Sequence, residues 1–298
     1  MKEYIRKLKI KIRSKKKVRL SRSIGGDIGI YIFLLLICAF MVLPILYSVM
    51  NAFKPLSELL MYPPRFYVKN PTLSNFSDII YLTETLEVPF LRYLFNSLFV
   101  TIVGTTLYLL VATLAGYALA KGTFVGRKAM SSLVVWALLF NASVMSIPRY
   151  IVIAKLGLVD TYGAIILPAL ASTMGVFLIR QYVVAGVPNA ILEAGRIDGA
   201  SEFRILFHIV LPAVKPALMT TIIFTFQSMW NGAGAGEFIY SERLKELPTV
   251  LSTISAGGLA RSGAAAAVAL ITMIPPIIVF LISQSSVMDT MTHSGLKG

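Results

Sequence analysis

The sequence has very few residues of the kinds that hold metal ions or crosslink a chain. Its 298 residues include one cysteine, Cys38, and two histidines, His208 and His293. A single cysteine cannot form a disulfide within the chain, and neither histidine has neighbours at the spacing of metal ligands. The sequence therefore predicts no metal site and no disulfide framework.

Motifs of common catalytic and nucleotide-binding sites are also missing. The chain contains neither HExxH nor GxSxG, which excludes the commoner metalloprotease and serine-hydrolase signatures. Residues 116–123 read GYALAKGT, in which lysine precedes glycine, so this is not a phosphate-binding loop. Gly232, Gly234 and Gly236 alternate without the strand-turn-helix context of a dinucleotide site. We expect no catalytic residue and no cofactor on this chain.

Charge is sparse as well, and this sets the fold class. Only 14% of the residues are charged and 56% are hydrophobic, with a mean hydropathy of +0.76. Such a composition is typical of a membrane protein, in which each spanning helix needs roughly 20 apolar residues. We expect an all-α, polytopic protein with six transmembrane helices at residues 28–50, 94–120, 129–147, 164–181, 214–231 and 263–282. Pro168 interrupts the fourth, and Pro275 and Pro276 lie in the sixth.

The cores of these six spans contain no ionisable residue. Proton relays, ion sites and voltage sensors usually need such a group inside the membrane. The absence favours an energy source outside the spans. A self-sufficient secondary transporter or channel for a neutral polar solute stays open as an alternative, because sodium can be held by carbonyl groups alone.

The net charge of +14 lies almost entirely on one side of the predicted membrane. The segments expected on that side are 1–27, 121–128, 182–213 and 283–298. Together with Arg180 and Lys215 at the span edges, they hold 19 of the 28 basic and 6 of the 14 acidic residues. The positive-inside rule then places both termini in the cytoplasm. Residues 2–22 carry most of this charge without stacking aromatics, so we expect contact with anionic lipid and no nucleic-acid binding.

One stretch between the fourth and fifth spans is neither a span nor a simple linker. Residues 188–212 read PNAILEAGRIDGASEFRILFHIVLP. Pro188 suits the start of a helix, Gly199 interrupts it, and Ser201 is placed to cap a second helix that Pro212 ends. The periodicity is compatible with a docking element that fits a protein groove and equally with an amphipathic helix lying on the membrane surface.

These residues resemble the EAA loop of permease subunits of binding-protein-dependent ABC importers, whose pattern is EAA, three residues, G, nine residues and I-x-LP. The loop residues singled out here are Glu193, Ala194, Gly195, Asp198, Gly199, Ile209, Leu211 and Pro212. Gly195 departs from the pattern by replacing the second alanine, which should loosen the helix by up to about 1 kcal/mol. Segments such as AGYALAK, KLGLVDTYGAIILPALAS and SMWN are similar to carbohydrate-uptake permeases related to the maltose transporter, and to their complex-oligosaccharide subgroup.

The resemblance implies a type I ABC importer transmembrane domain in five parts. These are a basic cytoplasmic tail at 1–27, a first transmembrane helix at 28–50, an extracytoplasmic loop at 51–93, a core at 94–283 that contains the coupling loop 188–212, and a cytoplasmic tail at 284–298. It further implies a non-enzymatic subunit of the bacterial cell membrane that forms half of a translocation pathway for a carbohydrate. The expected partners are a second related permease, an extracytoplasmic solute-binding (lipo)protein, and two cytoplasmic ATPase subunits that bind ATP and Mg and receive the loop at Glu193.

Uncharged polar residues near the spans are the candidates for a path that suits a neutral, hydroxyl-rich solute. The predicted pathway residues are Asn141, Gln227, Trp230 and Asn231. Singly, such residues more often form hydrogen bonds between helices, and a lone tryptophan at the end of a span more often anchors it at the interface. The sequence GAGAGEF after Asn231 departs from the bulkier family pattern, so no substrate contact is carried over there.

Overall fold

A computed structural model describes residues 24–84, 88–140, 144–232 and 235–294, and these residues form helices, turns and loops without any strand. The chain divides into two compact units, residues 1–48 and 49–298. The predicted pathway residue Asn141 lies outside the described residues. The all-α fold class is confirmed for the part of the chain that the structure describes.

Helix α2 (Ile24–Phe53) supplies the described part of the first unit and continues into the second. It contains the predicted span 28–50, and Pro44 lies inside it. Apolar residues occur on every side of this helix, as expected of a helix surrounded by lipid.

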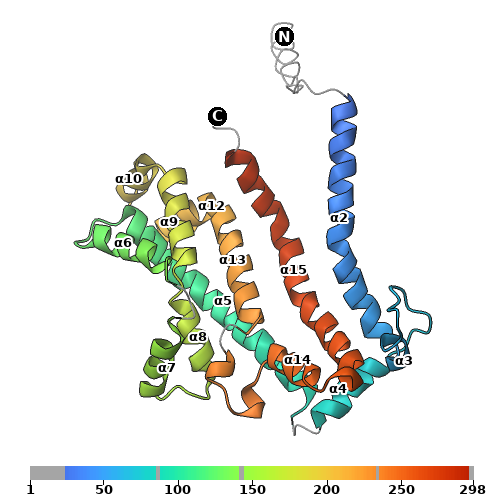
Figure 1. Cartoon of the computed structure of the whole chain (residues 1–298). Helices are drawn as coiled ribbons and strands as arrows, with labels where there is room; N and C mark the ends of the chain where they lie inside the picture. The colour runs from blue at the N-terminus through green and yellow to red at the C-terminus, as the bar shows by residue number, and fades with distance from the viewer. Residues whose placement is uncertain (1–23, 85–87, 141–143, 233–234, 295–298) are drawn as a thin grey trace. The chain divides into compact units, whose positions relative to one another are not determined.

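The second unit is a bundle built around one long helix. Its helices are α3 (Leu56–Leu59), α4 (Ser74–Glu84), α5 (Phe90–Lys121), α6 (Arg127–Ala137), α7 (Ser146–Lys155), α8 (Tyr162–Leu170), α9 (Met174–Gly186), α10 (Asn189–Ile197), α11 (Glu202–Ile205), α12 (Leu211–Ala213), α13 (Lys215–Trp230), α14 (Leu247–Ser255) and α15 (Ser262–Ser294). A π-helical turn (Leu206–Val210) joins α11 to α12. Figure 1 shows α5 running through this unit, with α8, α9 and α13 packed along it and α4 and α14 at its first half.

Helix α5 turns its small and polar residues inward. Its buried residues include Asn96, Ser97, Thr101, Gly104, Thr105, Tyr108, Ala112, Thr113, Gly116 and Tyr117. Small residues allow helix backbones to approach closely in a membrane, where apolar side chains can face lipid at no cost. At Gly116 an added Cβ would lie only 2.9 Å from the side chain of Ile179 on α9. Glycine at this position therefore permits the close packing of α5 and α9.

The number of membrane-spanning helices differs from the predicted six. Among the described residues, four helical segments are long and apolar enough to cross a membrane, namely Gly25–Phe53, Phe90–Lys121, Tyr162–Gly186 and Leu259–Gln284. A fifth results if Glu202–Ala213 and Lys215–Trp230, which are bent by 83° at their junction, are counted as one span. The structure thus supports four or five spans, and the count of six is not confirmed.

The difference arises at the predicted third span, 129–147. Helix α6 ends at Ala137 and α7 begins only at Ser146, so this stretch is not one continuous helix. The 11 residues of α6 rise about 16 Å, which is about half of the hydrocarbon thickness. Counting apolar residues without regard to helix continuity produced the predicted third span at 129–147.

Two other boundaries move. Helix α15 contains Pro275 and Pro276 and continues to Ser294, beyond the predicted start of the C-terminal tail at 284. The fourth predicted span is broken between α8 and α9 at Ala171–Thr173, and Pro168 lies inside α8 just before the break.

Candidate functional site

The loop 188–212 folds into short helices whose ends are set by the expected residues. Pro188 directly precedes α10, and Gly199 follows that helix with a φ of 78°, in the left-handed region that glycine adopts without strain. The side chain of Ser201 accepts a hydrogen bond from the backbone N–H of Arg204 and so caps α11. The last helix, α12, ends one residue after Pro212.

Helix α10 has one buried and one exposed face. Leu192 is 2% exposed and belongs to the apolar cluster that includes Val187 and Ile205. Glu193 is exposed, and Ile197 is 86% exposed. The helix is therefore anchored through Leu192, while the face with Glu193 and Ile197 is open to a partner.

Gly195, the departure from the EAA pattern, occupies a place where alanine would fit. A Cβ built there would lie 3.4 Å from a methyl group of Ile209 and 3.5 Å from Ile205, which are ordinary contact distances. Glycine is thus not required by space at this position, in contrast to Gly199, whose positive φ favours glycine.

Hydrogen bonds tie this loop to the end of α5. Tyr117 donates its hydroxyl to one carboxylate oxygen of Glu202 at 2.7 Å, and the guanidinium of Arg196 donates to the other at 2.7 Å. The hydrogen bond to Glu202, together with the charge of that carboxylate, raises the pKa of Arg196 above its ordinary value. The ammonium group of Lys121 also donates to Asn189 at 2.7 Å. Both helices of the loop, α10 and α11, are therefore bonded to the last turns of α5.

The opposite end of α5 holds a second loop. The amide of Asn96 donates to the backbone carbonyls of Arg243 at 2.9 Å and Lys245 at 2.8 Å. The hydroxyl of Ser97 accepts the backbone N–H of Leu247 at 2.7 Å, at the start of α14. Twenty residues of α-helix separate Ser97 from Tyr117, a rise of about 30 Å. One helix thus links two loops at its two ends.

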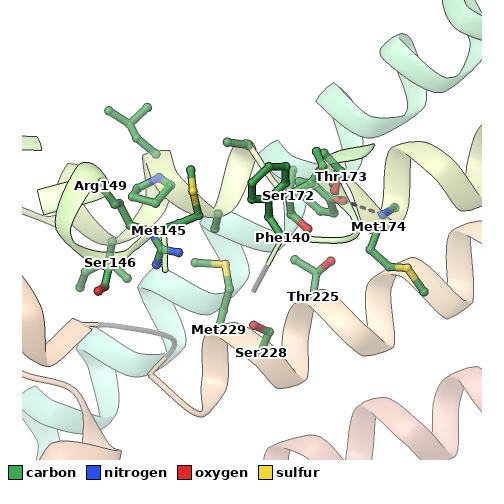
Figure 2. A pocket seen from close by; sticks show the side chains of 18 of the residues that line it. Phe140, Met145, Ser146, Arg149, Ser172, Thr173, Met174, Thr225, Ser228 and Met229 are labelled. Atoms are coloured by element: carbon green, nitrogen blue, oxygen red, sulfur yellow. Dashed lines mark hydrogen bonds between the residues drawn. The ribbon is translucent and has the colours of Figure 1, made fainter. Parts of the chain in front are cut away.

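A large cavity lies beside the middle of α5. Its volume is about 1150 Å³, and Tyr108 contributes to its wall from α5. Its polar wall residues include Ser146, Arg149, Ser172, Thr173, Thr225 and Ser228, which Figure 2 shows around the opening together with Phe140, Met145 and Met229. They come from α7, the α8–α9 break and α13. This mixture of hydroxyl groups and apolar surface is typical of a ligand pocket.

Tyr108 also stabilises the break between α8 and α9. Its hydroxyl donates to the backbone carbonyl of Ser172 at 3.0 Å and accepts the backbone N–H of Gly175 at 2.8 Å. A broken helix frees backbone groups that must be satisfied away from water, and a neighbouring side chain can do this. The break brings Ser172 and Thr173 into the cavity wall.

The described pathway residues predicted from sequence lie outside this wall. Gln227 and Asn231 are exposed and do not line the cavity. Trp230 is 1% exposed, stacks on Phe226 with ring centroids 6.0 Å apart, and donates its indole N–H to the carbonyl of Thr272 at 2.8 Å. In this structure the Trp230 ring is a packing element between α13 and α15.

Arg149 was not singled out by sequence reasoning, although it contributes to the cavity wall. A single arginine in a stretch expected to be an external loop carries no recognisable signal. The hydroxyl residues Ser172 and Thr173 lie in the same cavity wall as Ser146 because of the α8–α9 break, which no local sequence pattern reveals.

Comparison with known families and proteins gives consistent results. The profile of the family described as "Binding-protein-dependent transport system inner membrane component" matches residues 28–289. The arabinooligosaccharides transport system permease protein AraQ of Bacillus subtilis is 29% identical over 277 residues, which cover 91% of this chain and 96% of that protein. The polygalacturonan/rhamnogalacturonan transport system permease protein YtcP of the same species is 30% identical over 205 residues, or 69% of each chain.

A solved structure has the same fold. It is described as a bacterial ABC transporter involved in the import of the acidic polysaccharide alginate. One of its chains superimposes with a TM-score of 0.75 at 24% sequence identity, and the match covers 89% of this chain and 98% of that chain. The helix arrangement described above is therefore the fold of that chain.

Proposed function

The chain belongs to the family of binding-protein-dependent transport system inner membrane components, and on this premise we propose that it is an oligosaccharide permease subunit driven by separate ATPase subunits. Relatives named as permeases for arabinooligosaccharides and for polygalacturonan or rhamnogalacturonan support a saccharide as the solute. The family description itself makes the chain an integral membrane component of a system that depends on a binding protein.

The observation that carries this proposal is the set of attachments along α5. One end is bonded to the loop 188–212 through Tyr117 and Lys121, the middle contributes Tyr108 to the cavity, and the other end holds the loop before α14 through Asn96. A movement of the loop at one end would thus be passed by a rigid helix to the solute cavity and to the opposite loop. Rigid-body motion of this kind is a common basis of transport cycles.

The exposed face of α10 is the surface proposed to meet the ATPase. Glu193 offers a carboxylate to a basic partner residue, and Ile197 offers apolar area beside it. ATP and Mg would be bound by two such cytoplasmic subunits, and a second permease would complete the pathway. The chain itself binds no cofactor in this scheme, and both termini lie in the cytoplasm.

The test is transport in proteoliposomes that contain the complete transporter and its binding protein. ATP-dependent uptake of an oligosaccharide is expected, and Glu193→Ala should abolish it while the chain still inserts into the membrane. Glu84→Ala is the matched control, because Glu84 is an exposed carboxylate at the end of α4 with no role in the loop.

Two results would contradict the proposal. Uptake that persists without the ATPase subunits would indicate a self-sufficient transporter or channel. Unchanged transport and unchanged copurification of the ATPase with the Glu193→Ala variant would remove the coupling role of α10.

A further inference from the structure

The cavity contains a cation that has no partner among the residues that the structure describes. Arg149 lies on α7 in the cavity wall, is partly buried, and extends toward the interior in Figure 2. No carboxylate among the described residues lies within 4.0 Å of its guanidinium, and no described residue accepts a hydrogen bond from it. A partly buried guanidinium normally has a carboxylate, a phosphate or carbonyl oxygens as partners, because its five N–H donors are costly to leave unpaired away from water.

The acidic residue of the cavity wall is not a partner of Arg149. Glu237 is the other charged residue of the wall, and it is exposed at the end of the short turn Ala235–Glu237. It does not form an ion pair with Arg149. Solvent screens an exposed carboxylate more than a partly buried guanidinium, so Glu237 does not neutralise the positive charge of Arg149.

The rest of the wall indicates the chemistry of a ligand that would approach Arg149. Ser172, Thr173, Thr225 and Ser228 offer hydroxyl groups that can donate to or accept from sugar hydroxyls. Phe140 and Met229 offer apolar surface for the C–H faces of sugar rings. A volume of about 1150 Å³ exceeds the range typical of single drug-sized ligands, about 300–1,000 Å³, so more than one sugar ring fits.

From this arrangement we infer that the cavity is selective for an acidic oligosaccharide and that Arg149 binds a carboxylate group of the solute. The planar guanidinium matches a carboxylate with two parallel, charge-assisted hydrogen bonds, which are roughly twice as strong as those that the hydroxyl groups of a neutral sugar accept. This inference rests on the proposed function, since it names the class of oligosaccharide that the same cavity accepts. It replaces the neutral solute expected from the uncharged spans.

The experiment measures direct binding to the complete, detergent-solubilised transporter without its binding protein, whose own specificity would otherwise dominate. The probes are trisaccharides of galacturonate, glucuronate and mannuronate, each paired with its methyl ester, which has the same shape without the charge. Binding is measured by calorimetry for the wild type, Arg149→Gln and Lys155→Gln. Lys155 is the matched control because it is an exposed cation on the same helix, outside the cavity wall.

At least one acid should bind the wild type and the Lys155→Gln variant about tenfold more tightly than its ester. Arg149→Gln should abolish this difference by weakening the acid and leaving the ester unchanged. Equal binding of each acid and its ester to the wild type, no binding of any acid, or equal weakening of both by Arg149→Gln would overturn the inference. Competition by anionic lipid alone, with no effect of the sugar carboxylate, would assign Arg149 to a lipid headgroup and would also overturn it.

Uptake measurements separate this inference from the proposed function. The wild type and Arg149→Gln could take up a neutral oligosaccharide equally fast with ATP, and neither could take up an acidic oligosaccharide faster than the neutral one. This result would leave the permease role intact and remove the acidic selectivity. Absence of ATP-dependent uptake of every saccharide would contradict the permease role itself.

Discussion

The hydroxyl of Tyr117 donates a 2.7 Å hydrogen bond to Glu202, a residue 85 positions later in the chain. Tyr117 lies one turn before the end of α5, and Glu202 is the first residue of α11. Since Glu202 also accepts from Arg196 of α10, this carboxylate joins three helices. A displacement of the exposed face of α10 therefore reaches α5 through two hydrogen bonds as well as through the apolar cluster around Leu192.

Removal of the Tyr117 hydroxyl should weaken coupling without unfolding the chain. A hydrogen bond to a carboxylate as exposed as that of Glu202 contributes about 1.5 kcal/mol, so Tyr117→Phe should leave the thermal unfolding temperature within a few degrees of the wild type. The amount of solute transported per ATP hydrolysed should fall severalfold, while basal ATPase activity persists. Tyr182→Phe is the control, because Tyr182 is partly buried in the same region and none of the hydrogen bonds described involves its hydroxyl. Equal effects of both variants would contradict a coupling role for Tyr117.

The two glycines of the loop should respond oppositely to alanine. Gly199→Ala forces a side chain into the left-handed region at φ 78° and should destabilise the loop by about 1–2 kcal/mol. Gly195→Ala meets only ordinary contacts with Ile205 and Ile209, and it should be neutral or stabilise α10 by up to about 1 kcal/mol. Thermal unfolding of the purified variants in one detergent measures both. A lower unfolding temperature for Gly195→Ala than for Gly199→Ala would contradict the assigned backbone conformations.

Stability should depend on pH through Glu246, which directly precedes α14 in the loop after α13. The side chain is 1% exposed, its oxygens have no hydrogen-bond partner among the described residues, and burial raises its pKa to about 8. Between the ordinary pKa of 4.5 and about 8 the unfolded chain has lost this proton and the folded chain retains it. The free energy of unfolding should therefore fall as the pH rises through this range, by at most about 1.4 kcal/mol per pH unit.

Substitution of Glu246 by glutamine tests this dependence. The slope of the unfolding temperature against pH between 5 and 8 should flatten in Glu246→Gln, since an amide does not titrate. Glu237→Gln, which removes an exposed carboxylate from the same loop region, should leave the slope unchanged. A slope that is the same in the wild type and in Glu246→Gln would show that Glu246 is not the group responsible.

The break between α8 and α9 should depend on the hydroxyl of Tyr108. Tyr108→Phe leaves the carbonyl of Ser172 and the N–H of Gly175 without their partner in a buried environment. Each unsatisfied group costs about 1–3 kcal/mol, so the unfolding temperature should drop by several degrees. Tyr81→Phe, at an exposed tyrosine of α4, is the control and should have no effect. An unchanged unfolding temperature for Tyr108→Phe would indicate that water satisfies both groups.

Much of the helical framework follows from hydrophobic pattern alone. The predicted spans 28–50 and 214–231 correspond to α2 and α13 within a few residues. The ends of the short helices in the loop were also predictable, because Gly199 and Ser201 act through their own backbone and immediate neighbours. The predicted span at 129–147 is not confirmed, because apolar content does not report whether a helix is continuous.

The composition and local patterns of the sequence are sufficient to identify an all-α membrane protein with an EAA-like loop, because burial in lipid and helix capping depend on residues close together in the chain. The bond between Tyr117 and Glu202, the burial of Trp230, and the meeting of Arg149 with Ser172 and Ser228 depend instead on helix packing. These contacts join residues separated by tens of positions, and their geometry is set by close approach at glycines such as Gly116 and by the break after α8. Only the tertiary structure therefore reveals the link from the loop to the cavity and the positive charge within it.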